Sequence, residues 1–336
     1  MRIAINGFGR TGRIFLRQAF GLPNFDIVAI NDLSDVENLA YLLKYDSVYG
    51  RYQKDVSFKE NKLIVDGKEI LVLKEKEPKN LPWKDLDIDI VVEASGVFTS
   101  FEASKAHLEA GAKRVVITAP TKDEITLTFT PNLENREKIS SLGEQALITS
   151  NASCTTNSVN PVLAIMHKRI GVKKAILTTI HAYTNTQSLV DSITKGHDFR
   201  RGRAGAYNIV PSTTGAAEAT ARVLPYFKER FDGISIRVPV ITGSLSDITM
   251  VTERETSVEE VNNIFKEEAN KPEWQGILKV VEDQIVSSDI IGEPYGAIVD
   301  LTLTRVVNGD LVKVFSWYDN EWGYCAMLIK HIERLV

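Results

Sequence analysis

A glycine-rich turn between a short strand and a helix is the feature that most restricts what this chain can fold into. The turn, GFGRTG at residues 7–12, follows the apolar run Arg2 to Asn6 and precedes apolar residues at helical spacing between residues 15 and 20. A second apolar strand, Asp26 to Asn31, comes next. Because two parallel strands need a crossover connection, these residues predict a βαβ unit and a parallel sheet.

The residues of this turn have the spacing of a dinucleotide-binding motif. Gly7, Gly9 and Gly12 allow a tight turn and a close backbone approach, and the helix N-terminus that follows can hold a pyrophosphate. Asp32, about twenty residues further on, stands after the second strand, where an acid accepts a hydrogen bond from the adenosine ribose. Because its charge would repel a 2′-phosphate, the sequence favours NAD and leaves NADP as the alternative.

The length of the chain, 336 residues, predicts two lobes, because single cores stop growing at about 250–300 residues. The first lobe ends near Ser153. Its further candidate strands are Glu69 to Leu73, Ile88 to Glu93, Arg114 to Thr118 and Ala146 to Ser150. These strands predict an α/β fold with a Rossmann-type parallel-sheet domain at residues 1–153.

Long strands dominate the second lobe. Helices are expected at Thr155 to Ile170 and at Val258 to Lys271, and the candidate strands are Lys174 to Tyr183, Ile234 to Val240, Leu245 to Glu253, Ala297 to Arg305 and Leu311 to Tyr318. Because few helices separate these strands, we predict an α+β catalytic domain with a mixed or antiparallel sheet at residues 154–320. A final amphipathic helix follows, and Cys325 in its apolar stripe is expected to have a packing role.

Cys154 lies in a polar segment, Ser150 to Asn157, where a strand gives way to a helix. At a helix N-terminus the macrodipole favours a thiolate and lowers the pKa of the thiol, which predicts a nucleophile. The alternative is a small buried cysteine. His181, towards the end of the strand that starts at Lys174, is the candidate base, although a histidine at a strand end is by itself more often structural.

The other four histidines are expected to be solvated or to have satisfied hydrogen bonds; they are His107, His167, His197 and His331. Several further residues are suited to binding anions. They are Thr184, the Arg200, Arg201 and Arg203 loop, Thr213-Thr214-Gly215, and Arg237. Each alone is typical of a surface or turn, but together with a thiol and a nicotinamide they suggest a phosphorylated substrate.

Composition excludes several classes of protein. The 40 Lys and Arg and 44 Asp and Glu residues give a net charge of −4, so no global positive field favours nucleic acid. The two cysteines form no CxxC or zinc-finger pattern, so no disulfide framework or metal site is predicted. The N-terminus has no signal-peptide pattern, and the uncharged stretch Gln145 to His167 is too polar for a membrane span. A cytoplasmic location is expected.

Motifs spread in order along nearly the whole chain carry a family resemblance. They are INGFGRTGR at the start, Asn31-Asp32-Leu33, LLKYDS at residues 42–47, SNASCTTN around Cys154, HAYTNTQ at 181–187, RRGRAGAYNIVPSTTGAA at 200–217, RVPV at Arg237 and WYDNEWGY at 317–324. The first motif is shared with many dehydrogenases, whereas the cysteine and WYDNE motifs are highly specific. The sequence closely resembles phosphorylating glyceraldehyde-3-phosphate dehydrogenases.

The resemblance implies a role for particular residues. Cys154 corresponds to the nucleophile and His181 to its base. The cofactor positions are Arg10, Thr11, Asp32, Lys76, Thr118 and Asn320, of which Asn320 would orient the nicotinamide carboxamide. Thr184 and Arg237 match the site for the substrate's own phosphate. The site for inorganic phosphate is matched by Ser153, Thr155, Arg201, Thr214 and Gly215.

The implied activity is the oxidation and phosphorylation of glyceraldehyde 3-phosphate to 1,3-bisphosphoglycerate with NAD and inorganic phosphate, in glycolysis or gluconeogenesis. It would proceed through a thiohemiacetal and a thioester on Cys154. The resemblance also implies a homotetramer and a C-terminal helix, 321–336, that completes the dinucleotide-binding domain. Two alternatives stay open: erythrose-4-phosphate dehydrogenase, which uses the same thiol and base without phosphorolysis, and a non-catalytic NAD- or RNA-binding protein.

Overall fold

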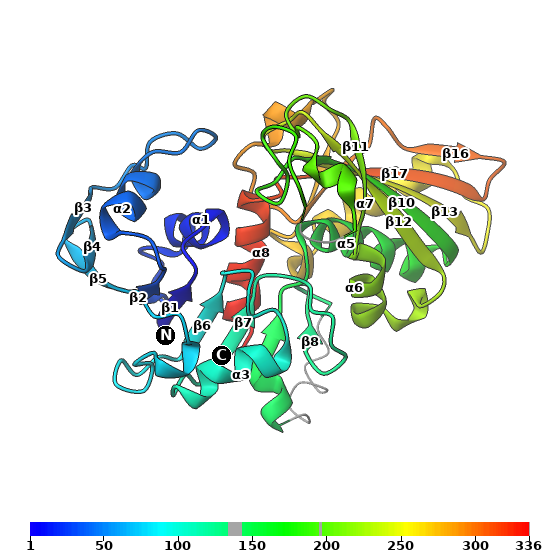
Figure 1. Ribbon diagram of the computed structural model, residues 1–336. Coiled ribbons are helices and arrows are strands. Elements are labelled where there is room, and N and C mark those ends of the chain that lie inside the picture. The colour runs from blue at the N-terminus through cyan, green and yellow to red at the C-terminus, as the bar shows by residue number, and fades with distance from the viewer. Residues whose placement is uncertain (134–142, 195–196, 336) are drawn as a thin grey trace. The chain divides into compact units, whose positions relative to one another are not determined.

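The computed structural model describes residues 1–133, 143–194 and 197–335, and these form two compact units (Figure 1). Of the described residues, 1–129, 143–152 and 328–335 belong to the first unit, and 130–133 and 153–327 belong to the second. The assignment of a dinucleotide-binding domain to 1–153 with 321–336, and of a catalytic domain to 154–320, stays a prediction.

The first unit is built on a nine-stranded sheet in the order β3-β4-β5-β2-β1-β6-β7-β9-β8. Its parallel strands are β1 (Arg2–Asn6), β2 (Asp26–Asn31), β5 (Lys68–Leu73), β6 (Ile90–Glu93), β7 (Arg114–Ile117), β8 (Leu127–Thr128) and β9 (Ile148–Ser150). The central strands β1 and β6 are almost wholly buried, as their continuous apolar runs require in a parallel sheet covered on both faces. The predicted Rossmann-type parallel sheet is confirmed.

Helices α1 (Arg10–Ala19), α2 (Val36–Lys44) and α3 (Phe101–Glu109) belong to the same unit. Two strands that sequence reasoning missed, β3 (Val56–Lys59) and β4 (Lys62–Val65), form an antiparallel edge next to β5. Three of the four residues of β3 are exposed. The residues of β3 (VSFK) alternate between apolar and polar, but over only four positions, the shortest run that can indicate a strand.

The second unit contains an eight-stranded mixed sheet in the order β11-β12-β10-β13-β17-β15-β14, with β16 paired to β17. The strands are β10 (Val172–Ala182), β11 (Val210–Thr213), β12 (Phe231–Val238), β13 (Ser244–Thr252), β14 (Leu278–Val281), β15 (Ala297–Asp300), β16 (Arg305–Val307) and β17 (Leu311–Tyr318). The pairs β10–β12 and β14–β15 are parallel, and the other pairs are antiparallel. The predicted mixed sheet is confirmed.

Helices α5 (Cys154–Arg169), α6 (Ala216–Val223) and α7 (Val258–Ala269) pack with this sheet around one apolar core (Figure 1). The apolar face of α5 supplies Val159, Val162, Leu163 and Met166 to that core. Helix α8 (Trp322–Glu333) follows β17, and Cys325 is fully buried in its apolar stripe, as predicted. Short 3-10 helices lie at Pro78–Asn80, Gly143–Leu147, Phe199–Gly202, Pro225–Phe227, Pro272–Trp274 and Ser287–Ile290.

One predicted strand is wrong in its extent. Of the run Ala297 to Arg305, only the part up to Asp300 is strand β15, and Arg305 is the first residue of a separate strand, β16. The Asp300 carboxylate accepts hydrogen bonds from the backbone N–H of Thr302 (3.0 Å) and from its hydroxyl (2.6 Å). An aspartate that bonds to the backbone two residues later stabilises a turn, and this local competition ends the strand.

Candidate active site

Cys154 is the first residue of helix α5, as its sequence position predicts. The hydroxyl of the preceding residue, Ser153, accepts a hydrogen bond from the N–H of Thr156 (3.1 Å) and so caps the helix. No acidic residue occurs in the first turn. The thiol therefore lies at the positive end of a long, capped helix.

The backbone turn that leads to this helix is held in an uncommon conformation. Ala152 has a φ of 54° and is completely buried. A non-glycine residue in the left-handed region costs about 1–2 kcal/mol, and such positions persist only where surrounding contacts over-determine them. Here the Ser150 hydroxyl accepts the Ala152 N–H (3.0 Å) and donates to the Ala119 carbonyl (2.7 Å). The strained turn is thus fixed two residues before the thiol.

The imidazole of His181 lies next to the thiol, as predicted. Its Nε2 atom is 3.4 Å from the Cys154 sulfur. Strand β10 carries His181, and the parallel register of β10 and β12 pairs it directly with Arg237. Helix α5 and strands β10 and β12 of the second unit therefore bring a thiol, an imidazole and a guanidinium together.

The contacts of the other imidazole nitrogen fix the tautomer. Nδ1 lies 2.7 Å from the carbonyl oxygen of Ala182 and 2.9 Å from Nη1 of Arg237. The guanidinium Nη1 also lies 3.2 Å from that carbonyl. Because a carbonyl only accepts, both nitrogens donate to it, and Nδ1 carries the proton. Nε2 then has a free lone pair directed at the thiol, which is what a base needs.

Burial controls the electrostatics of this pair. It lowers the pKa of His181 to about 3, and the positive charge of Arg237 acts in the same direction. Burial also raises the pKa of the Cys154 thiol, against the opposing effects of the Arg237 charge and of hydrogen bonds from Thr155. The backbone N–H groups at the start of α5 lower this pKa, as the sequence position predicts, but burial has the larger effect and the net direction is upward.

Sequence reasoning missed Tyr318, which lies against the same histidine. Its ring meets that of His181 edge to face, with 5.9 Å between the centroids. The buried hydroxyl of Tyr318 lies 3.0 Å from the hydroxyl of Thr155 and 2.7 Å from that of Thr179. Its place in the WYDNEWGY motif, two residues before Asn320, was the available signal. It joins the base to the first turn of α5.

The candidate residues for binding phosphate are spread over several loops. Arg201 donates to the Ser212 hydroxyl (2.8 Å), and its charge lowers the pKa values of both His181 and Arg237. The Thr184 hydroxyl lies 3.0 Å from that of Thr186. The charge of Arg201 therefore lies close enough to His181 and Arg237 to affect both.

Two further candidates lie at the start of α6. The Thr214 hydroxyl accepts the Ala216 N–H (3.2 Å), and Gly215 is the N-cap residue without a side-chain cap. Among the described residues, no hydrogen bond joins Thr184, Thr214 or Gly215 to Cys154, His181 or Arg237. Arg237 itself has a buried Nε atom without a hydrogen-bond partner and no carboxylate within ion-pair distance in the described chain. Such an uncompensated cation is suited to an anionic ligand.

In the first unit, the glycine turn has the shape that a dinucleotide needs. Gly7 has a φ of 92°, and a Cβ atom there would lie 2.5 Å from Cα of Ser95. A Cβ on Gly12 would lie 2.3 Å from the carbonyl oxygen of Gly7, whereas one on Gly9 would meet open space. Gly9 is also the N-cap of α1 and supplies no side-chain cap. A helix N-terminus lined by backbone in this way is suited to an anion.

Asp32 is positioned by this turn. One carboxylate oxygen accepts the N–H of Phe8 (2.8 Å) and the other accepts the N–H of Ser34 (2.9 Å). The carboxylate is therefore held at the carboxyl end of β2, beside the glycines, where a ribose would bind. These observations fit the dinucleotide that the motif predicts.

The remaining cofactor candidates differ in their surroundings. Arg10 and Thr11 begin α1, and the Arg10 guanidinium forms an ion pair with Asp46. Lys76 is exposed after β5, and the Thr118 N–H donates to the carbonyl of Glu93 (3.0 Å) at the end of β7.

Asn320 lies in the second unit, and its side-chain orientation is fixed. The amide oxygen accepts hydrogen bonds from the Gly243 N–H (3.1 Å) and from the hydroxyls of Ser244 (2.9 Å) and Thr242 (3.4 Å). These three donors identify the oxygen and leave the two N–H groups of the amide directed elsewhere.

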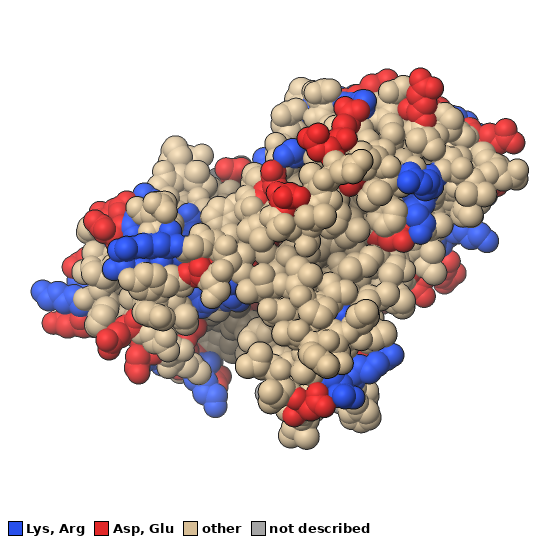
Figure 2. Space-filling model, turned by 90° about the horizontal axis from the view of Figure 1, so that it is seen from above, with Lys and Arg blue, Asp and Glu red and all other residues tan. Residues whose placement is uncertain are grey.

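Other kinds of site find no support in the residues that the structure describes. Within them, no group of three or more His, Cys, Asp or Glu side chains is placed to hold a metal ion. In the same parts of the chain, no helix combines the length and apolar character needed to cross a bilayer. On the face in Figure 2, Lys and Arg side chains lie among Asp and Glu and form no continuous basic patch.

A parallel sheet with a glycine turn, together with a thiol at a helix N-terminus that faces an imidazole on a mixed sheet, is typical of NAD-dependent dehydrogenases that use a thiol nucleophile. Comparison with known proteins agrees with this class. Residues 1–101 match the NAD binding domain of glyceraldehyde 3-phosphate dehydrogenase, and residues 153–320 match its C-terminal domain.

Curated relatives match over nearly their full length. The chain is 48% identical to the glyceraldehyde-3-phosphate dehydrogenase of Thermotoga maritima, with 100% of this chain and 99% of that protein aligned. It is 46% identical to that of Streptomyces coelicolor (98% and 96%) and 44% identical to that of Clostridium pasteurianum (99% and 97%). The chain belongs to the glyceraldehyde-3-phosphate dehydrogenase family. The predictions of the family, of an NAD-dependent dehydrogenase and of NAD as cofactor are confirmed.

Proposed function

We propose that this chain oxidises and phosphorylates glyceraldehyde 3-phosphate to 1,3-bisphosphoglycerate, using inorganic phosphate. The observation that carries the proposal is the Cys154–His181–Arg237 group, in which a base faces a thiol and a cation lies beside both. The role of NAD, when bound, is to accept the two electrons of the oxidation as a hydride. The nucleophile, the base and the groups that stabilise charge come from the chain itself, and inorganic phosphate supplies the second nucleophile.

The first step is addition of the thiol to the aldehyde. The Nε2 atom of His181 takes the thiol proton while sulfur bonds to the carbonyl carbon, and the proton then passes to the new oxygen to give a thiohemiacetal. The N–H groups at the start of α5 stabilise the negative charge on that oxygen during the attack. In the oxidation step His181 accepts the hydroxyl proton, and a thioester remains on Cys154.

Phosphate then attacks the thioester, the acyl phosphate leaves, and the thiol regains its proton from His181. Covalent catalysis divides one difficult oxidation and phosphorylation into separate steps. The low pKa of His181 in the free chain makes it a weak base, and the Arg237 charge contributes to this. A substrate phosphate bound at Arg237 would offset that charge, so substrate binding would make the base stronger.

The binding roles follow from the same arrangement. The substrate phosphate would bind Thr184 and Arg237, of which Arg237 lacks a carboxylate partner among the described residues. Inorganic phosphate would bind at Ser153, Thr155, Arg201, Thr214 and Gly215. NAD would bind at Gly7, Gly9, Arg10, Thr11, Gly12, Asp32, Lys76 and Thr118 in a domain formed by residues 1–153 and 321–336. Asn320, in a catalytic domain of residues 154–320, would donate from its amide to the carboxamide.

The decisive experiment uses the Cys154→Ser variant. NADH formation from glyceraldehyde 3-phosphate and phosphate should be lost, while NAD binding measured by calorimetry should be retained. Retained turnover would contradict the covalent mechanism. The parent chain should also need phosphate for rapid turnover and prefer NAD to NADP; a rate independent of phosphate would contradict phosphorylation.

A homotetramer in the cytoplasm is part of the proposal. The mixed sheet has an open face, and strand register places Ile176, Ile234 and Leu311 on that same face, on strands β10, β12 and β17. All three are exposed, and a hollow of about 510 Å³ lies beside Ile176 and Leu311. Exposed apolar clusters of this kind are typical of subunit interfaces. Light scattering after gel filtration should give four chains per particle, and Ile176→Glu should lower the mass; a monomeric parent chain would contradict this assembly.

A further inference from the structure

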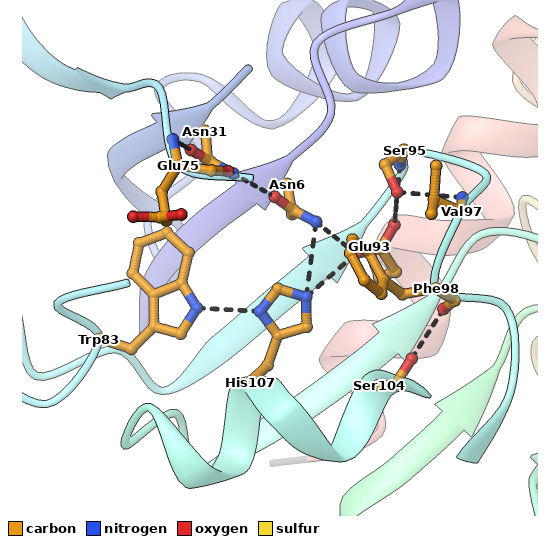
Figure 3. A network of polar contacts seen from close by, with 10 residues as sticks. All are labelled: Asn6, Asn31, Glu75, Trp83, Glu93, Ser95, Val97, Phe98, Ser104 and His107. Carbon is orange, nitrogen blue, oxygen red and sulfur yellow. Dashed lines mark hydrogen bonds and ion pairs between the residues drawn. The ribbon is translucent and has the colours of Figure 1, made fainter. Parts of the chain in front are cut away.

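A chain of buried polar side chains lies across the carboxyl edge of the parallel sheet (Figure 3). The indole N–H of Trp83 donates to Nδ1 of His107 (3.0 Å), and Nε2 of His107 lies 3.0 Å from a carboxylate oxygen of Glu93. All three residues are essentially inaccessible to solvent. Because an indole nitrogen only donates, Nδ1 of His107 must accept, and the imidazole proton is on Nε2.

Glu93 is the unusual member of this hydrogen-bonded network. Its second oxygen accepts from both the N–H (2.9 Å) and the hydroxyl of Ser95, and the first also accepts from the Asn6 amide (2.5 Å). Four donors therefore meet one buried carboxylate, and in the described part of the chain no Lys or Arg lies within ion-pair distance of it. A buried carboxylate is expensive to maintain, so its retention calls for a role beyond filling the core.

The network continues along the ends of the strands. The Asn6 amide oxygen accepts from the side-chain amide of Asn31 (2.7 Å). That amide also donates to the backbone carbonyl of Glu75 and accepts from the Glu75 N–H, both at 2.9 Å. These three residues each adjoin a cofactor candidate: Asn6 precedes Gly7, Asn31 precedes Asp32 and Glu75 precedes Lys76. Ser95, held by Glu93, is the residue whose backbone leaves no room for a side chain on Gly7.

We propose that the hydrogen-bonded side chains of Trp83, His107, Glu93, Asn6 and Asn31 form a positioning network. This network fixes the backbone at the carboxyl edge of the sheet where the adenosine half of NAD binds. Glu93 is its anchor, because it alone contacts both the Asn6 branch and the Ser95 backbone against which Gly7 packs. None of the five side chains needs to touch the cofactor. The proposal rests on the cofactor site described above, in which Asp32 receives the ribose.

The test is calorimetric titration of NAD and of ADP-ribose, which lacks the nicotinamide. Glu93→Gln turns an acceptor into a donor, and in either amide orientation an N–H group faces existing donors. We expect both ligands to bind about tenfold more weakly, the ratio that loss of one charge-assisted hydrogen bond corresponds to. The turnover number at saturating NAD should be unchanged, because the thiol and its base are not involved.

Glu268→Gln is the matched control. Glu268 is equally buried, and it accepts from Arg169 (2.8 Å), Lys271 (2.6 Å) and the indole N–H of Trp274 (3.3 Å) in the second unit. This variant should lower the melting temperature and leave ADP-ribose affinity unchanged. If Glu93→Gln also lowers only the melting temperature, the network is merely structural and the proposal is overturned. If the parent chain itself fails to bind ADP-ribose, the cofactor site is wrong instead.

A second variant tests the direction of the hydrogen bonds. Trp83→Phe frees Nδ1 of His107 to carry the proton, so that Nε2 can accept from the new amide at position 93. The double variant Glu93→Gln with Trp83→Phe should therefore bind ADP-ribose more tightly than Glu93→Gln alone, and weaker or equal binding would contradict the assigned tautomer. Asn6→Ser breaks the link to Asn31 without removing a charge; it should also weaken ADP-ribose binding, and it decides the question if Glu93→Gln does not fold.

Discussion

The guanidinium of Arg237 lies against the imidazole of His181, with 2.9 Å between Nη1 and Nδ1. The contact follows from strand register, because the two residues are direct partners in the parallel pair of β10 and β12. The charge of Arg237 lowers the pKa of His181 and also opposes the rise in the pKa of Cys154 caused by burial. One side chain therefore influences both members of the thiol–imidazole pair.

Replacement of this cation should move both pKa values upward. In Arg237→Gln the thiolate loses a favourable charge, so the pH at which iodoacetamide labels Cys154 at half its maximal rate should rise by about one pH unit. The pKa of His181 should rise as well but stay below its ordinary value, because burial is the larger cause. Arg200→Gln is the control, since Arg200 is exposed and paired with Asp198. An unchanged or lower labelling midpoint for Arg237→Gln would contradict this account.

Stability should fall as the pH falls below the ordinary pKa of histidine. Burial lowers the pKa of His331 to about 3, and that of His181 is likewise about 3. Between that value and the unfolded value of about 6.5, the unfolded chain binds protons that the native chain does not, so stability rises with pH there and is complete above it. Each histidine contributes a slope of about 1 kcal/mol per pH unit.

Urea unfolding of His331→Gln across this pH range measures the contribution of His331 to the pH dependence of the free energy of unfolding. Glutamine can replace part of the hydrogen bonding of His331 to Thr149 and Asn151 but does not titrate. The variant should show a flatter dependence of unfolding free energy on pH than the parent chain. A slope equal to that of the parent would show that His331 is not held neutral.

Two glycines of the turn should respond differently to alanine. In Gly12→Ala the new Cβ meets the Gly7 carbonyl, so the free chain should lose about 1–3 kcal/mol of unfolding free energy. In Gly9→Ala the Cβ points into open space. Stability should therefore be retained while NAD affinity falls, if that space receives the dinucleotide. Thermal unfolding and NAD titration of the two variants decide this, and normal NAD affinity of Gly9→Ala would contradict it.

The strained backbone at Ala152, before the thiol, leads to a further prediction. Ala152→Val places a β-branched side chain at a buried residue with positive φ, and should lower the free energy of unfolding by about 2 kcal/mol. Ala152→Gly relieves the backbone and removes one methyl group, so it should stay within about 1 kcal/mol of the parent. Chemical denaturation distinguishes the two. Equal stability of the valine and glycine variants would show that the turn can relax.

Much of this fold could be predicted because its strongest signals are local. β1 and β2 have the predicted bounds, since continuous apolar runs next to a glycine turn leave little choice. The β3–β4 edge was missed because each strand has only four residues, which is too short for a clear periodic pattern. The limits of α5 differ from the prediction by one residue at each end, because the Ser153 cap sets its start.

The site could be predicted less completely. Motifs identify Cys154 and His181, and the structure places them together, although their binding and catalytic roles stay proposals. The direction of the thiol pKa could not be predicted, since it depends on burial, which is a property of the assembled sheet and not of the helix. His107 was expected to be solvated or satisfied; it is fully buried and bonded to Trp83 and Glu93. No spacing in the sequence links these three residues.

The last helix has a consequence for how the protein is made. His331 lies in the core of the first unit, where it contacts Thr149 and Asn151 and meets the ring of Phe129 edge to face. Residues near the C-terminus are the last to leave the ribosome. His331 is synthesised after Phe129, Thr149 and Asn151, with the whole of the second unit between them, so this part of the core of the first unit can form only after the second unit has been made.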